Sequence, residues 1–477
     1  MNVDIPGYYF DPEKKKYFKI EKSHTAPSTA SWSSHNVKRR KRHDAEVEAQ
    51  ERRAKLTRRH IKRSRALRDP NLCGLLTREL GLRDPSLDGL RSATDVPSAI
   101  YAAKLGSRGS ISSRDNEVLG TRAAHPECFW VGPSPGSAGR IFCSSDHAHA
   151  ERMSLTPPRH YKVTSDGSLR EARDAAGYSR TEAGNVFSAY FAPAASSMSY
   201  SEKEDVLLLS SHLAPTRVWM VGPTARSDEI VSLAGKRLPR DLSINRVIAA
   251  PRSSSHLSAV IGTNAGIAFV DTRRKVNFVC HVAAANTADD DEQKPRHFDV
   301  LAQSFHVSNP SILYAGLRGS QVYGLDTRTP ARAVTQLRHA SSVAQLSTLE
   351  SNENHLIAAG PRSAMAIYDI RCLRRQFNLR KNQSTTPVLN FPSYNNDAHI
   401  QIGFAVDQGG RIVAAADSER GVGIYSLLSG RRLASTVIDA IRSDGIIKAL
   451  QFQTLSQDRH PSLWVGLAGG VGKYSVL

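Results

Sequence analysis

The sequence predicts an all-β protein, a seven-bladed β-propeller, preceded by a basic N-terminal extension that is partly helical or disordered. Three observations support this prediction. A pair of short apolar strands joined by a turn recurs seven times, and the pairs run from about residue 120 to the end of the chain. No amphipathic helix of ~10–15 residues separates them, which argues against an α/β fold. Small sheets that recur in this way bury their faces against each other around a central axis.

The seven strand pairs define the repeat. The first strand of each pair is expected at 128–132, 206–211, 257–262, 312–316, 356–360, 412–417 and 463–469. The second is expected at 139–145, 216–222, 266–273, 321–328, 365–371, 421–428 and 470–477. Five of the six intervals are 43 to 57 residues, near or slightly above the ~40–45 of a WD-type blade. The first interval, of 77 residues, contains the polar stretch 193–205, which is expected to be a surface loop.

The last strand pair ends at the C-terminus on the third strand of its blade. An open sheet edge is a liability, so a segment ahead of the first blade is expected to add the fourth strand. Residues 98–105 are the predicted donor of that strand. Small residues such as Ala315, Ala358 and Ala414 in the inner strands are expected to let neighbouring sheets approach closely.

The positive charge is concentrated in one segment. Of the net charge of +19, residues 38–68 hold +10, from fourteen Lys or Arg against four acids. No stretch reaches the ~18 apolar residues of a membrane span, and the N-terminus lacks a signal-peptide pattern. The five cysteines form no CxxC pair, which indicates reduced thiols in the cytosol or the nucleus.

Composition divides the residues before the propeller into three segments. Residues 1–22 predict an aromatic hairpin around Asp11-Pro12, and 23–43 a Ser-rich and basic linker. Residues 44–95 predict a basic helix–loop–helix extension, and the propeller is expected from 96 to 477. The hairpin is expected either to pack on the propeller or to serve as a separate docking element.

Two residue groups in this extension are candidates for function. Five basic residues resemble a nuclear localisation cluster: Lys38, Arg39, Arg40, Lys41 and Arg42. Four leucines form one apolar helical stripe: Leu72, Leu75, Leu76 and Leu80. The stripe is expected to pack on the propeller or in a partner's groove. For the basic run 38–68, a solvated helix, nuclear import and RNA or phosphate contact are the alternatives.

No catalytic arrangement is found, so the sequence does not predict an enzyme, and no cofactor is expected. The stretch 469–475 superficially suggests a phosphate-binding loop, but Tyr474 occupies the Ser/Thr position. The group Cys143, Asp146, His147 and His149 lacks a second ligand group at metal-site spacing. A propeller without converging catalytic residues is most often a binding platform.

Three consecutive second strands end in an Asp-x-Arg sequence. The pairs are Asp271 with Arg273, Asp326 with Arg328, and Asp369 with Arg371. Each Asp is placed to accept backbone N–H bonds in the turn that follows, and each Arg is placed outside the strand. The next two blades have serine instead of aspartate, so the three arginines are expected to form a basic arc on one face. Turn stabilisation alone is the alternative.

These boxes, together with residues 5–20, resemble those of the cullin-4 ubiquitin-ligase substrate receptors, the damaged-DNA-binding-adaptor and cullin-associated factors. The Tyr368-Asp369-x-Arg371 copy has an aromatic residue before the Asp, as in that family's docking box, whereas Val270 and Leu325 depart from it. The resemblance implies that residues 44–82 and the arginines Arg273, Arg328 and Arg371 contact the ligase adaptor.

The resemblance implies a nuclear, WD-repeat substrate receptor of a cullin-4 RING ligase. Its partners would be the ligase adaptor, the cullin-4 scaffold and a protein substrate that the sequence does not identify. The alternative is a nuclear propeller scaffold in RNA or ribosome biogenesis, in which residues 38–68 contact RNA and the arginines only hold turns.

Overall fold

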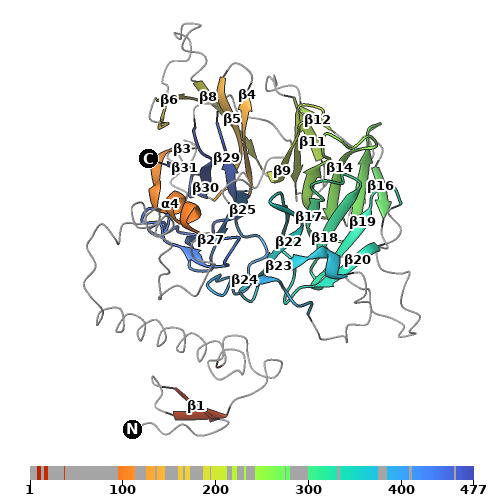
Figure 1. The fold of residues 1–477 in the computed structure, drawn as a ribbon. Coiled ribbons are helices and arrows are strands. Elements are labelled where there is room, and N and C mark those ends of the chain that lie inside the picture. Colours follow the sequence, from red (N-terminus) through yellow and green to blue (C-terminus); the bar gives the residue numbers. More distant parts are fainter. Residues whose placement is uncertain are drawn as a thin grey trace, which may run out of the picture. The chain divides into compact units, whose positions relative to one another are not determined.

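A computed structural model describes residues 8–11, 16–19, 37, 95–112, 125–134, 137–145, 159–164, 167–171, 186–193, 195–211, 218–222, 230–232, 242–273, 276–279, 299–329, 333–373, 384–407, 411–455 and 458–476. The chain divides into two compact units, Met1–Ala93 and Thr94–Leu477. Figure 1 shows the strands of the second unit arranged as blades. Within the described residues, no helix is both long and apolar enough to cross a membrane.

The first unit contains an antiparallel hairpin at the place where the sequence predicts one. Strand β1 (Tyr8–Asp11) pairs with β2 (Lys16–Lys19), so that Phe10 lies opposite Tyr17 in the register. Tyr8 and Tyr17 are exposed. The cluster Lys38–Arg42, the stripe Leu72–Leu80 and the remainder of 44–82 lie outside the described residues.

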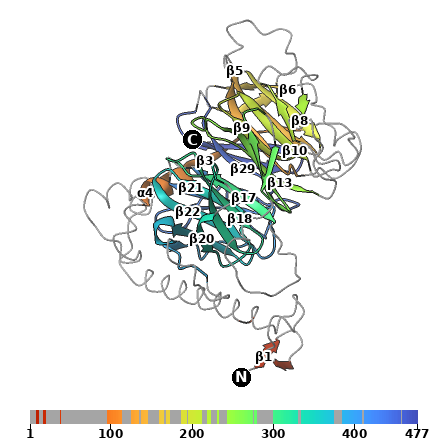
Figure 2. The same cartoon turned by 90° about the vertical axis from the view of Figure 1, so that its right-hand side faces the viewer.

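The second unit contains seven sheets, so the predicted seven-bladed propeller is confirmed; Figure 2 shows it from the side. Blade 2 consists of β9 (Ala195–Ser201), β10 (Val206–Ser211), β11 (Val218–Val221) and β12 (Ile230–Ser232). Blade 3 consists of β13 (Ile244–Ala249), β14 (Leu257–Thr263), β15 (Gly266–Asp271) and β16 (Val276–Val279). Blade 4 consists of β17 (Val300–Phe305), β18 (Ile312–Leu317), β19 (Gln321–Asp326) and β20 (Ala333–Arg338).

The next two blades have the same plan. Blade 5 consists of β21 (Gln345–Leu349), β22 (Asn352–Gly360), β23 (Ala364–Asp369) and β24 (Leu389–Asn390), with a short 3-10 helix, η4 (Ile370–Leu373), after β23. Blade 6 consists of β25 (Phe404–Asp407), β26 (Ile412–Ala416), β27 (Val422–Ser426) and β28 (Arg432–Leu433). Blades 2 to 6 are therefore antiparallel meanders of four strands each.

Blade 1 departs from this plan. Its five strands are β4 (Phe129–Ser134), β5 (Ser137–Ser145), β6 (Arg159–Val163), β7 (Leu169–Glu171) and β8 (Val186–Pro193). The spatial order is β4-β5-β8-β6-β7, and β8 runs parallel to β5. A parallel neighbour needs a long crossover, which residues 146–185 provide. The hairpin of β6 and β7 within that crossover extends the outer edge of the sheet.

The prediction that the polar stretch 193–205 is a surface loop is wrong for most of its length. Residues 195–201 form β9, the first strand of blade 2, with Ser197 and Ser201 buried. The hydroxyls of Ser197 and Ser199 accept hydrogen bonds from the backbone N–H groups of Val247 (3.1 Å) and Ala249 (2.9 Å) in blade 3. Serine suits this position because its hydroxyl satisfies the neighbouring strand where two sheets approach closely. The extra length of the first interval lies in the crossover instead.

Blade 7 is closed by a strand from the beginning of the unit, as expected. It consists of β29 (Leu450–Gln453), β30 (Ser462–Leu467), β31 (Gly470–Val476) and β3 (Leu105–Ser112). The predicted donor residues are wrong, because all of 98–105 except Leu105 belongs to the helix α4 (Val96–Lys104). Alanine is the best helix former and a proline at the first turn is well tolerated, so Pro97 and the alanines favour the helix.

The core of the propeller lies between blades. Seven buried apolar clusters are present among the described residues, and each combines side chains of two neighbouring blades. Consecutive residues of one strand alternate between two clusters: Ala358 faces blade 4 and Ala359 faces blade 6. Ala414 and Ala415 alternate in the same way between blades 7 and 5. These small residues allow the close approach of sheets that the sequence indicates.

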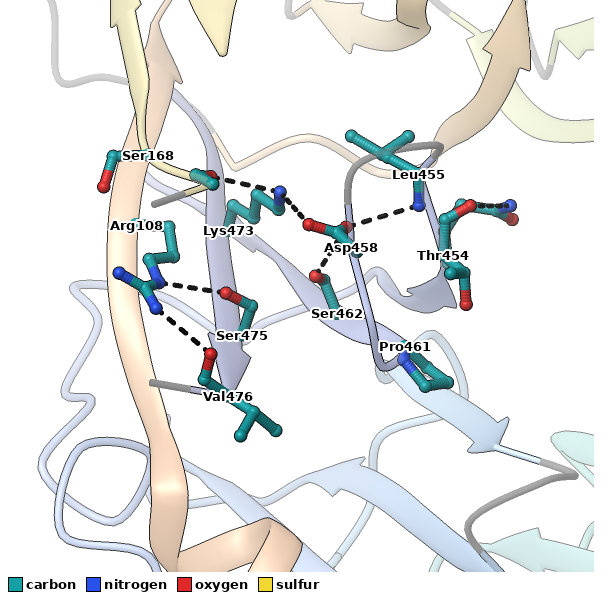
Figure 3. A network of polar contacts seen from close by, with 12 residues as sticks. Arg108, Ser168, Thr454, Leu455, Asp458, Pro461, Ser462, Lys473, Ser475 and Val476 are labelled. Atoms are coloured by element: carbon teal, nitrogen blue, oxygen red, sulfur yellow. Dashed lines mark hydrogen bonds and ion pairs between the residues drawn. The ribbon is translucent and has the colours of Figure 1, made fainter. Parts of the chain in front are cut away.

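A buried ion pair within blade 7 positions a lysine that contacts blade 1 (Figure 3). Lys473 on β31 is fully buried, and its Nζ lies 2.8 Å from Asp458 Oδ1 and 3.1 Å from the carbonyl oxygen of Gly167 in blade 1. Asp458 also accepts a hydrogen bond from Ser462 Oγ (2.9 Å). The ammonium lies 5.7 Å from the ring centre of Trp464. Lys473 is therefore an internal structural cation, and the stretch 469–475 is a strand rather than a phosphate-binding loop.

Candidate functional site

The three Asp-x-Arg boxes lie on one face of the propeller. Asp271 ends β15, Asp326 ends β19 and Asp369 ends β23, and each is the last residue of the third strand of its blade. In a meander, the turn after the third strand lies on the same side as the turn after the first. We call this side the box face, and the side with the turns between second and third strands the opposite face. Blades 3, 4 and 5 are consecutive, so the boxes form a continuous arc.

In two of the boxes the aspartate holds the arginine that follows it. Arg328 donates its backbone N–H to Asp326 Oδ1 (3.0 Å), and its Nε and Nη2 donate to Oδ1 (3.0 Å) and Oδ2 (2.7 Å). Arg371 donates to Asp369 in the same pattern, with its N–H at 2.9 Å, Nε at 3.1 Å and Nη2 at 2.7 Å. Each aspartate therefore stabilises the turn and orients the guanidinium through a bidentate contact.

The electrostatics follow from this geometry. Hydrogen bonds from Arg328 lower the pKa of Asp326 to about 2, and Arg371 likewise lowers the pKa of Asp369. Both carboxylates are therefore ionised at neutral pH. The side chains of Arg328 and Arg371 are 64% and 65% exposed, whereas those of the aspartates are 17% and 12% exposed. The boxes thus present oriented guanidiniums to solvent while the acids stay close to the protein body.

The third box, in blade 3, has the same placement. Asp271 is half-buried at the end of β15 and Arg273 is exposed two residues later. The prediction that Tyr368 contacts a partner does not agree with the structure. Its side chain is buried, only 2% exposed, and its hydroxyl is 2.8 Å from His339 Nδ1. Tyr368 therefore supports the fifth blade from inside and has no surface to offer a partner.

Neighbouring groups make the box face rigid and partly apolar. His256 Nε2 of blade 3 lies 3.1 Å from Thr327 Oγ1 inside the box of blade 4. Thr327 donates its N–H to the carbonyl oxygen of Ser311 (2.8 Å), which ties the two turns of that blade together. One exposed valine, Val307, lies on the same face, in the turn after β17. The arginine of blade 4 therefore stands in a turn that side-chain and backbone hydrogen bonds hold in place.

The boxes of the next two blades are completed from elsewhere in the chain. In blade 6, buried Ser426 takes the place of the aspartate: its Oγ accepts the N–H of Leu428 (3.1 Å) and donates to the carboxylate of Asp95. In blade 7, Arg108 Nε donates to Ser475 Oγ (3.0 Å) and its Nη2 to the carbonyl oxygen of Val476 (3.1 Å), as Figure 3 shows. The closure segment, residues 95–112, thus supplies both missing groups.

Sequence reasoning missed these two residues. Asp95 and Arg108 lie more than 300 residues from their partners in the chain, and neither belongs to a repeated pattern. The serines at 426 and 475 were the available signal, since a serine hydroxyl must find a second partner once it is buried. The remaining predicted contacts, Leu72, Leu75, Leu76 and Leu80, and three members of the 143–149 group lie outside the described residues. Cys143 is buried in β5, and burial raises its pKa to about 12.

Comparisons with known proteins assign no family to this chain. No protein-family model and no curated protein matches the sequence. Among solved structures, a chain of the mitotic checkpoint complex superposes with a TM-score of 0.40. The two chains are 16% identical, and the match covers 58% of this chain and 74% of the other. A propeller of this kind is typical of protein-interaction scaffolds.

Proposed function

We propose that this protein is a substrate receptor of a cullin-4 RING ubiquitin ligase and docks to the ligase adaptor through the box face. The observation that carries the proposal is the pair of guanidiniums of Arg328 and Arg371, each oriented by its own aspartate and about two-thirds exposed. An arginine held in place before binding loses little conformational freedom when it meets an acceptor on a partner. The resemblance of the boxes and of residues 5–20 to the cullin-4 receptors supports the same role.

In this role the protein itself performs no chemistry. A receptor holds its substrate beside a ubiquitin-charged enzyme and so raises the effective concentration of the reacting groups. The adaptor would meet the arginines on the box face, and residues 44–82, with the leucine stripe, would form a second contact. The basic cluster at 38–42 would direct the protein to the nucleus.

Affinity purification of the full-length protein, followed by mass spectrometry, tests this proposal. We expect adaptor and cullin-4 peptides with the wild type and their loss with the double variant Arg328→Ala/Arg371→Ala. Arg362→Ala is a matched control, because Arg362 is an exposed arginine in the turn between β22 and β23, on the opposite face. Absence of both partners from the wild-type sample would refute the receptor role.

The basic segment supports a second candidate, an RNA-associated nuclear scaffold. Residues 38–68 hold a net charge of +10, which suits contact with phosphates. In that case RNA binding should weaken steeply with salt and disappear when 38–68 is deleted, while the box arginines can be replaced without effect. The deletion of 38–68 and the double variant Arg328→Ala/Arg371→Ala therefore separate the two functions.

A further inference from the structure

Blade 3 carries an arginine that reaches into the centre of the ring. The first strands of neighbouring blades contact each other, as β13 does with β9 and β17, so these strands surround the axis. From β13, Arg246 donates its Nη1 to Gln345 Oε1 on β21, at 2.7 Å. Gln345 in turn donates Nε2 to the carbonyl oxygen of Ile402, ahead of blade 6 (2.9 Å). Because blades 3 and 5 are not neighbours in the ring, this chain of contacts lies in the space that the first strands enclose.

The guanidinium of Arg246 has no acidic partner. Among the described residues, no carboxylate lies within ion-pair distance of it, and neither Nε nor Nη2 makes a hydrogen bond. Burial lowers the pKa of Arg246. Lys473, the buried cation of blade 7, by contrast has Asp458 beside it. Arg246 is half-buried, and a partly desolvated cation without a counter-charge gains from an anion that joins it.

A second, independent feature lies on β17, the first strand of the neighbouring blade 4. Gln303 on β17 is 3% exposed, and both its amide nitrogen and its amide oxygen lack a partner within the part of the chain that the structure describes. A Cβ on Gly262 would collide with Gln303 Nε2, so the amide fills the space above that glycine. Gly262 lies directly opposite Arg246 in the ladder of β13 and β14. Residues opposite each other in a ladder share a face of the sheet, so the unpaired amide and the guanidinium lie on the same face.

The position along the strands gives the direction of approach. Arg246 lies near the start of β13, and Gln345 is the first residue of β21. In these blades the first strand starts on the opposite face and runs toward the box face. Arg246 and Gln345 therefore lie toward the mouth of the central channel on the side away from the Asp-x-Arg arc. The amide of Gln303 lies over Gly262, near the end of β14 on that same side.

We propose that Arg246, Gln303 and Gln345 form a binding site for an oxyanion, a carboxylate or a phosphate, in the central channel. The edge of the guanidinium that carries Nη2 and Nε matches the two oxygens of such a group. Gln303 Nε2 supplies a further donor, and Gln345 holds Nη1 in place. The anion neutralises Arg246 and satisfies the buried amide in one step. This site is separate from the adaptor contact and does not depend on it.

Thermal melts of the full-length protein in chloride and in inorganic phosphate, at matched ionic strength, test the site. A ligand at 100 times its Kd should raise the melting temperature by roughly 3 °C for a domain of this size. We expect this shift for the wild type and for the control Arg362→Gln, which removes one positive charge from the same face. We expect no shift for Arg246→Gln. An equal shift in Arg246→Gln, or none in the wild type, overturns the proposal.

Two further samples keep the test decisive. Gln303→Leu retains the charge of Arg246 and removes only the amide, so it should reduce the phosphate shift even if Arg246→Gln fails to fold. An unreduced shift in Gln303→Leu contradicts the site as drawn. A hexaglutamate peptide replaces phosphate in a parallel series, and a larger Arg246-dependent shift with the peptide identifies an acidic protein segment as the source of the oxyanion. A larger shift with phosphate identifies a small free anion.

Discussion

Blades 3 to 5 and blades 6 and 7 stabilise the turn after the third strand in different ways. In blades 4 and 5, an aspartate at the end of the third strand accepts the backbone N–H of the arginine two residues later and also holds the guanidinium of that arginine. In blades 6 and 7 a serine occupies that position, and Asp95 and Arg108 of the closure segment complete the contacts. The first arrangement leaves oriented guanidiniums in solvent, whereas the second uses its polar groups to fasten the closure segment. We call blades 3 to 5 the docking half of the box face, after the role proposed for their arginines, and blades 6 and 7 the closing half.

The largest expected effect concerns the closing half. Asp458→Ala leaves the ammonium of Lys473 buried without its partner, and we expect a loss of about 3–5 kcal/mol in the free energy of unfolding. The double variant Asp458→Leu/Lys473→Met removes both charges and should recover most of that loss. Chemical denaturation of the three proteins measures this. A loss below about 1 kcal/mol in the single variant would show that the pair does not stabilise the packing of Lys473 between blade 7 and blade 1.

Mild acid should weaken the contacts of blade 5, in the docking half, more than the corresponding contacts of blade 6. Burial lowers the pKa of His339 to about 4, and this imidazole is bonded to the Tyr368 hydroxyl in blade 5. In blade 6, Tyr425 donates to the carbonyl oxygen of Ser393, which does not titrate in this range. Because the unfolded chain protonates His339 near pH 6.5, its contribution is present above that pH and is lost as the pH falls toward about 4.

Denaturation from pH 7 to pH 5 measures the size of this effect. We expect a loss of about 2 kcal/mol at pH 5 that is reduced in His339→Gln. Asp326 and Asp369 contribute at lower pH, since their lowered pKa values keep them ionised down to the acid range. If the free energy of unfolding falls with pH equally in the wild type and in His339→Gln, His339 is not the group responsible for the loss.

A smaller effect compares the two kinds of turn directly. Asp95→Ala leaves the buried hydroxyl of Ser426 without its acceptor, and we expect a loss of about 1–2 kcal/mol in the free energy of unfolding. Asp326→Ala removes a more exposed pair and should cost less, below about 1 kcal/mol. Thermal melts of the two variants, measured side by side, show which substitution costs more stability. The reverse order would mean that the local box, not the closure segment, carries the stability of this face.

The sequence predicts the local features of the blades well and the contacts of the closure segment poorly. The strands of the repeats and the Asp-x-Arg boxes are local patterns, and each predicted strand segment overlaps a strand of the structure. The closing strand was predicted in principle but misplaced, because "SAIYAAK" is compatible with both helix and strand until α4 packs against blades 6 and 7. Strand β9 was missed because its serines are satisfied by blade 3, a contact 50 residues away.

The candidate site shows the same limit. Spacing alone places Asp369 and Arg371 on a turn, but it does not show that Tyr368 points into the core or that Arg371 returns to its own aspartate. The partners of Ser426, Ser475 and Arg246 come from distant parts of the chain, so no local pattern reveals them. What the sequence cannot predict is the set of contacts that form only when the ring closes.

The most direct test of the docking half is the affinity of the purified adaptor for Arg371→Ala. We expect a loss of about 2–4 kcal/mol in binding free energy, because truncation leaves acceptors on the adaptor unpaired. The loss should exceed that of Arg273→Ala, and the melting temperature should stay close to that of the wild type, since the ion pair is exposed. Arg362→Ala on the opposite face should bind as the wild type does. A stable Arg371→Ala protein that binds the adaptor with unchanged affinity would contradict the account.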